Sequence, residues 1–94
     1  MDVQEYAKYV IDNIKLAKIG SIFKITNKVM SEYNSLAFIE ALYPELLRVK
    51  GQKAFNIMRA LNDTKEALVC KYYKVNEQMV MDKLVLLIYK EMKK

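Results

Sequence analysis

The chain contains only two glycines, Gly20 and Gly51, and one proline, Pro44, among its 94 residues. Sandwiches and barrels need many tight turns with positive φ, a conformation that glycine adopts at the lowest cost. Helices joined by short polar segments need few such turns. The shortage therefore predicts an all-α, mostly helical fold. The hydrophobic content of 53% is enough for one core.

The length predicts a single helical domain over residues 1–94. One cysteine, Cys70, cannot form an internal disulfide, so nothing indicates an oxidising compartment. Asp2 and Glu5 occupy the region where a signal peptide would carry positive charge. The longest apolar run, 84–89, is far shorter than the roughly 20 residues of a membrane span. We therefore expect a cytoplasmic protein with no membrane partner.

Apolar residues recur at helical spacing over most of the chain. The first predicted helix covers 3–17 behind the N-cap Asp2, and we expect Gly20 to terminate it. The second covers 22–33 with Ser21 as its cap. Its start is β-branched and aromatic enough for a short strand, but the apolar spacing favours a helix.

Asn34 or Ser35 caps the third predicted helix, which ends before Pro44 because proline suits the first turn of a new helix. The later helices are expected over 44–50, 52–61, 64 to about 73, and 76–94, with breaks at Gly51, Asn62–Asp63 and Asn76. Residues 67–75 also fit a strand, which would form a short winged hairpin. We expect at least five of these segments to form helices, in a compact domain of five to six helices.

The last predicted helix, 76–94, has an unusually wide apolar surface. It comprises Val80, Met81, Leu84, Val85, Leu87 and Ile88. This is more than one side of a helix buries in a domain of this size. We therefore expect a homodimer that pairs through the C-terminal helix.

The residues that most enzymes and metal sites use are missing. There is no histidine, the commonest general base and a common metal ligand. One cysteine excludes zinc sites built from four cysteines or from two cysteines and two histidines. Two isolated glycines cannot form a glycine-rich phosphate loop. The sequence therefore predicts a binding protein with no catalytic residue, no metal and no cofactor.

The basic residues are unevenly distributed along the chain. The net charge is +5, which attracts polyanions such as nucleic acid. No acid occurs over 46–62, which carries Arg48, Lys50, Lys53 and Arg59. A second acid-free stretch, 13–31, carries Lys15, Lys18, Lys24 and Lys28. This stretch fits a flank that contacts the nucleic-acid backbone, and it equally fits a solvated lysine face.

Residues 45–61 resemble the helix-turn-helix of bacterial and phage regulators. The motif positions are filled by Leu46, Leu47, Gly51, Ile57, Ala60 and Leu61. Lys50 and Gln52 depart from the pattern, because the family usually has aliphatic side chains beside the glycine. A second segment, 64–87, fits the core offsets better, but Lys74 replaces the glycine and its second helix carries carboxylates.

The first resemblance implies a dimeric transcriptional regulator or plasmid or phage maintenance factor that binds double-stranded DNA. Lys53 and Arg59 would lie on the outer face of helix 52–61, with Gln52 and Asn56 reading base edges. Arg48 and Lys50 would hold phosphates at the turn. The alternative is a small helical protein-protein interaction module, a phage-type inhibitor, adaptor or assembly factor with no nucleic-acid role. The wide apolar face of the last helix and the six methionines favour it.

Overall fold

A computed structural model describes residues 1–70 and 76–94, which form five α-helices and two 3₁₀ turns. In chain order these are α1 (Val3–Asn13), η1 (Ile14–Leu16), α2 (Ile19–Glu32), α3 (Ser35–Glu45), η2 (Leu46–Arg48), α4 (Gln52–Val69) and α5 (Glu77–Lys93). The predicted all-α class is confirmed, and no strand occurs in these two ranges. Most of the proposed hairpin, 71–75, lies outside the described residues.

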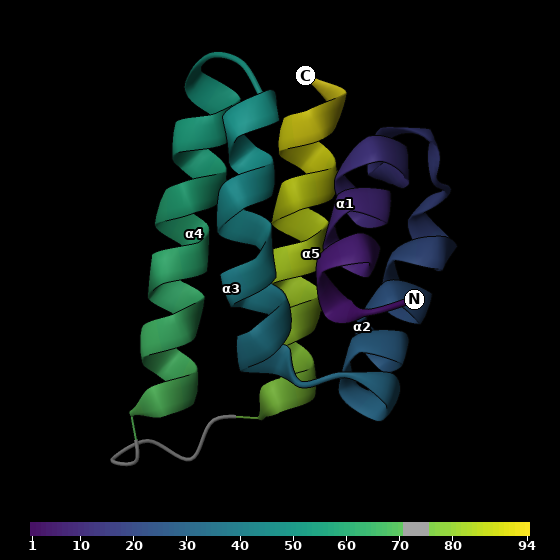
Figure 1. The fold of residues 1–94 in the computed structure, drawn as a ribbon, viewed down its shortest axis with the longest axis vertical. Helices are drawn as coiled ribbons and strands as arrows, with labels where there is room; N and C mark the ends of the chain where they lie inside the picture. The colour runs from purple at the N-terminus through teal and green to yellow at the C-terminus, as the bar shows by residue number, and fades with distance from the viewer. Residues whose placement is uncertain (71–75) are drawn as a thin grey trace.

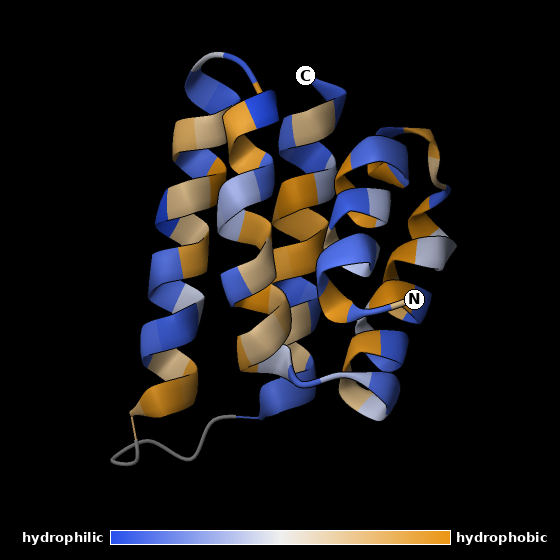
Figure 2. Ribbon diagram, viewed as in Figure 1, coloured by the Kyte–Doolittle hydropathy of each residue, from blue (hydrophilic) through white to orange (hydrophobic). Residues whose placement is uncertain are grey.

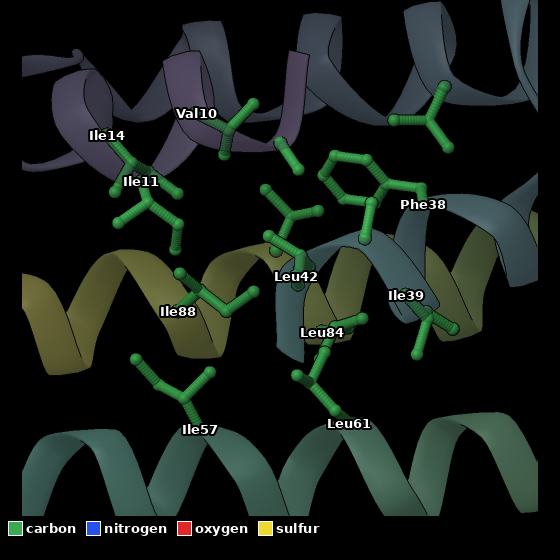
Figure 3. Packing of buried hydrophobic residues seen from close by; sticks show 14 of the residues in the cluster. Val10, Ile11, Ile14, Phe38, Ile39, Leu42, Ile57, Leu61, Leu84 and Ile88 are labelled. Atoms are coloured by element: carbon green, nitrogen blue, oxygen red, sulfur yellow. The ribbon is translucent and has the colours of Figure 1, made fainter. Parts of the chain in front are cut away.

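Successive helices run in alternating directions along the long axis of the molecule (Figure 1). α5 packs against both α4 and α2, while α1 packs against α3. The buried side chains of these helices form one cluster, which includes Val10, Phe38, Leu42, Ile57, Leu61, Leu84 and Ile88 (Figure 3). No helix in the described part of the chain is long and apolar enough to cross a membrane.

The apolar residues of α5 that the sequence singles out are covered, wholly or in part, by the rest of the chain. Met81, Leu84, Val85 and Ile88 are buried, and Val80 and Leu87 are partly buried. Because α4 and α2 pack on it from different sides, the helix has no wide unpaired stripe. The inference that this helix carries more apolar surface than the domain can bury is therefore wrong. The homodimer stays a prediction that has lost the observation behind it.

The break near Gly20 exists, but the glycine does not cause it. α1 ends at Asn13 and continues as η1, after which Ala17 and Lys18 adopt extended backbone. Gly20 then lies inside α2, so its prediction as a helix terminator is wrong. Ser21 also lies inside α2 and does not cap it. The helical interpretation of 22–33 is confirmed.

Pro44 does not begin a helix. It lies in the last turn of α3, where it removes one backbone bond at an exposed site, and only the 3₁₀ turn η2 follows. The predicted helix over 44–50 is therefore wrong. The break at Asn62–Asp63 is also wrong, because α4 runs through it to Val69. Leu61 and Thr64 are buried on either side, so core packing outweighs the local turn preference.

Candidate functional site

Three segments that carry many Lys and Arg residues meet at one end of the bundle, where η1, the turn between η2 and α4, and the last turn of α5 lie (Figure 1). Hydrophilic residues surround the η2–α4 turn and the last turn of α5 there (Figure 2). The segments that form this basic end are 12–24, 45–53 and 90–94. They hold nine of the 16 Lys and Arg residues: Lys15, Lys18, Lys24, Arg48, Lys50, Lys53, Lys90, Lys93 and Lys94. The same segments hold only three of the 11 acidic residues: Asp12, Glu45 and Glu91.

All three acids of the basic end are already paired. Two guanidinium nitrogens of Arg48 lie 2.7 Å from Asp12 Oδ1 and 2.6 Å from Glu45 Oε1. The Lys94 ammonium lies 2.8 Å from Glu91 Oε1. Hydrogen bonds to Asp12 and then to Glu45 raise the pKa of Arg48, which keeps its positive charge. The other seven cations have no ion-pair partner in the described part of the chain.

A hollow of about 260 Å³ opens among these cations, and we call it the basic hollow. Its polar lining comprises Lys15, Arg48, Lys50, Lys53 and the single acid Asp12. Ile11, Val49 and Met92 supply its apolar lining. The hollow therefore joins the two acid-free stretches, 13–31 and 46–62, which the order of residues alone does not place together. Lys15, which the sequence indicates only as part of a flank, belongs to this main cluster.

Three of the six predicted site residues, Arg48, Lys50 and Lys53, line the basic hollow. Lys50 is exposed, and Arg48 ties the hollow to α1 through Asp12. Lys53 is partly buried, and its ammonium donates to the backbone oxygen of Lys94 at 3.1 Å. The expectation that Lys53 lies on the free outer face of its helix is therefore wrong. It faces the C-terminal end of α5.

The other three predicted residues, Gln52, Asn56 and Arg59, lie outside the hollow. The Asn56 amide donates to Glu91 Oε2 at 3.3 Å and accepts a bond from Gln52 Nε2 at 3.2 Å. Asn56 is thus engaged with α5 and is not free to read a base edge. Gln52 and Arg59 are exposed.

Glu91 connects the last turn of α5 to α4, a role that its position in the sequence does not reveal. The residue is only 9% exposed. Hydrogen bonds from Lys94 and Asn56 hold its pKa below the ordinary value. This contact fixes the position of the chain end beside Lys53.

The helices around the predicted turn differ in direction from a helix-turn-helix. α3 and α4 run antiparallel and side by side (Figure 1), whereas the two helices of that motif cross at about 90–120°. Gly51 between them has φ of 81°, so the positive φ expected at the turn is confirmed. Reading of duplex DNA by such a motif remains a prediction from the sequence. The second candidate segment includes residues 71–75, which lie outside the described ranges.

Within residues 1–70 and 76–94, no group of three or more carboxylate or cysteine side chains could hold a metal ion. No protein-family model, curated protein or solved structure matches the chain.

Proposed function

We propose that the protein binds nucleic acid through contacts from its basic end to the phosphate backbone. The observation that carries this proposal is the basic hollow, in which Lys15 meets three cations from 48–53 around one acid. Lysine and arginine bind nucleic acid mainly by neutralising phosphates and releasing counterions. Such contacts position a protein on the backbone and need no particular base sequence.

The side chains near the hollow favour backbone contact over base reading. Asn56 is held by Glu91, and Gln52 is bonded to Asn56. Lys50 is exposed at the rim, where a phosphate oxygen can approach its ammonium. The amide groups of the first turn of α4 lie beside it, and they attract anions as well.

The test is equilibrium binding of a fluorescently labelled oligonucleotide at several salt concentrations. Replacing both Lys15 and Lys50 by Ala removes two cations of the hollow, and both side chains are exposed, so folding should be retained. We expect weaker binding and a salt slope that is smaller by about 0.7–0.9 per lost phosphate contact.

A matched variant replaces Lys8 and Lys83, which are exposed and lie outside the segments of the basic end. It has the same net charge as the Lys15 and Lys50 variant, and we expect it to bind like the parent. Equal weakening in the two variants would mean that only net charge matters. Absence of binding by the parent protein would overturn the proposal.

A protein-binding module is the second candidate, favoured by apolar side chains exposed at one corner. Leu16 is 78% exposed, Ile19 61% and Phe23 48%. Ile19 and Phe23 lie four residues apart on the same face of α2, and Leu16 belongs to η1, the turn that precedes this helix. This candidate would be supported if a partner protein no longer binds when Ile19 and Phe23 are replaced by Ser. Replacing the exposed Met79 by Ser should leave that binding unchanged.

A further inference from the structure

A second hollow, of about 440 Å³, lies between α1 and α2. This volume is in the range of about 300–1,000 Å³ that is usual for sites of small organic groups. Tyr6 and Tyr9 of α1, Lys24 and Lys28 of α2, and Leu16 of η1 line it. Val10, Ile14 and Ile25 add apolar surface, and no acidic side chain is part of the lining. We call this site the α1–α2 hollow.

Tyr9 is the exposed end of a row of aromatic rings. Its ring lies 6.1 Å from that of Tyr6 at an interplanar angle of 19°, and the Tyr6 ring stacks on Tyr33 at 5.2 Å. Tyr6 is buried and also contacts Phe38, so the row is anchored in the core. Tyr9 itself is 51% exposed. A planar group that stacks on it meets a surface that is already ordered.

Positive charge accompanies the aromatic surface. Lys24 and Lys28 lie four residues apart and so on one side of α2. The Lys28 ammonium lies 5.3 Å from the centre of the Tyr6 ring and 3.6 Å from Glu32. Lys24 has no ion-pair partner in the described ranges. An anionic group beside a stacked ring therefore has Lys24 available.

The α1–α2 hollow adjoins the basic hollow. The end of α1 and the turn η1 lie between them, since Asp12 and Lys15 line the basic hollow while Asn13 and Leu16 line the other. A nucleic-acid strand held by phosphates at the basic hollow can continue over η1 to Tyr9. Proteins bind single-stranded nucleic acid by combining cations that follow the phosphate backbone with aromatic side chains on which the bases stack.

We propose that the α1–α2 hollow receives an unpaired nucleic-acid base stacked on Tyr9, with Lys24 at an adjoining phosphate. The ligand is then single-stranded or locally unpaired nucleic acid. An intact duplex does not fit this role, because its base faces are covered by neighbouring bases and must be exposed at a cost in energy. The inference rests on the proposed backbone binding and specifies its ligand.

The experiment compares three labelled probes of about ten nucleotides: oligothymidine, an abasic strand with the same number of phosphates, and a duplex. The full chain should bind oligothymidine about tenfold more tightly than the abasic strand, because base stacking adds to phosphate contact. Tyr9→Ala should reduce oligothymidine binding to the abasic level and leave abasic binding unchanged. Tyr9→Phe, which keeps the ring, should bind like the parent.

Phe55→Ala is the matched control, because Phe55 is 53% exposed and lies on α4 away from the hollow. It should not change the preference for bases. If Tyr9→Ala fails to fold, Tyr9→Leu keeps the apolar bulk and removes the stacking ring. Equal binding of oligothymidine and the abasic strand, or tightest binding of the duplex, would overturn this inference and leave backbone binding intact. Failure to bind any of the three probes would instead reject the proposed function itself.

Discussion

Glu91 is a carboxylate enclosed by donors at the basic end of the molecule. The Lys94 ammonium and the Asn56 amide lower its pKa from the ordinary value of 4.5. A group whose folded-state pKa is lowered stabilises the folded state above its unfolded pKa, and this contribution is lost as the pH falls through the folded pKa. The contacts of Glu91 are therefore present at neutral pH and disappear in acid.

Glu91→Gln should accordingly destabilise the protein at pH 7 and reduce its sensitivity to acid below about pH 4.5. Urea unfolding at pH 7 and pH 3 measures both effects. The control is Glu66→Gln, since Glu66 is exposed on α4 and makes none of these contacts. A Glu91→Gln protein that loses as much stability as the parent between the two pH values would contradict this role of the carboxylate.

Residue types along 46–62 predicted the cations of the hollow, but not which of their atoms are free. Asn56 and Glu91 are 35 positions apart, and Lys53 and Lys94 are 41 apart. No local pattern reveals such pairs, because they depend on where α5 ends relative to α4. The base-reading roles assigned to 52–61 assumed an uncovered helix. The last turn of α5 packs against Lys53 and Asn56, so their side of the helix is covered.

The helix ends show which local signals can be trusted. Asp2, Asn34 and Asn76 cap their helices as predicted, because a short side chain that accepts from free backbone N–H groups acts within three residues. Gly20 and Pro44 misled the prediction because each is compatible with a helix end without causing one. Their positions were decided by the packing of α2 and α3 against the core.

The two glycines should respond oppositely to alanine. A Cβ at either position meets no atom within 4 Å, so only the backbone decides. Gly51 has φ of 81° and ψ of −160°, a region nearly restricted to glycine, so Gly51→Ala should cost about 1–3 kcal/mol of unfolding free energy. Gly20 is the second residue of α2, so Gly20→Ala should stabilise, but by less than the roughly 1 kcal/mol that applies in a helix interior. Chemical unfolding of both variants measures the sign of each change in the free energy of unfolding. Equal changes in the two variants would contradict these backbone assignments.

At the scale of the whole molecule, the separation of charge arises from the fold. The alternating helices bring the starts of the two acid-free stretches and the basic last turn of α5 to the same end. Each segment is visible in the sequence, and the net charge of +5 already suggested a polyanion. Their convergence depends on the direction of each helix and on the pairing of η1 with α5, which periodicity does not specify.

The position of α5 also leads to an expectation about assembly. A homodimer through α5 would require its buried residues, such as Leu84 and Ile88, to leave the contacts with α4 and α2. In place of the homodimer predicted from the sequence, we therefore expect a monomer of 11.0 kDa at micromolar concentration and moderate salt, measured by light scattering.

The exposed apolar residues Leu16, Ile19 and Phe23 are a second surface through which two copies of the chain could associate. The measurement must distinguish this association from one through α5. If a dimer appears and the Ile19→Ser, Phe23→Ser double variant is monomeric, association uses that surface and leaves α5 in the core. Either dimer would contradict the expected monomer, and one that persists in the double variant would point again to the C-terminal helix. Because Ile19 and Phe23 are exposed, the variant should keep its helical circular dichroism spectrum, which confirms that the comparison is between folded proteins.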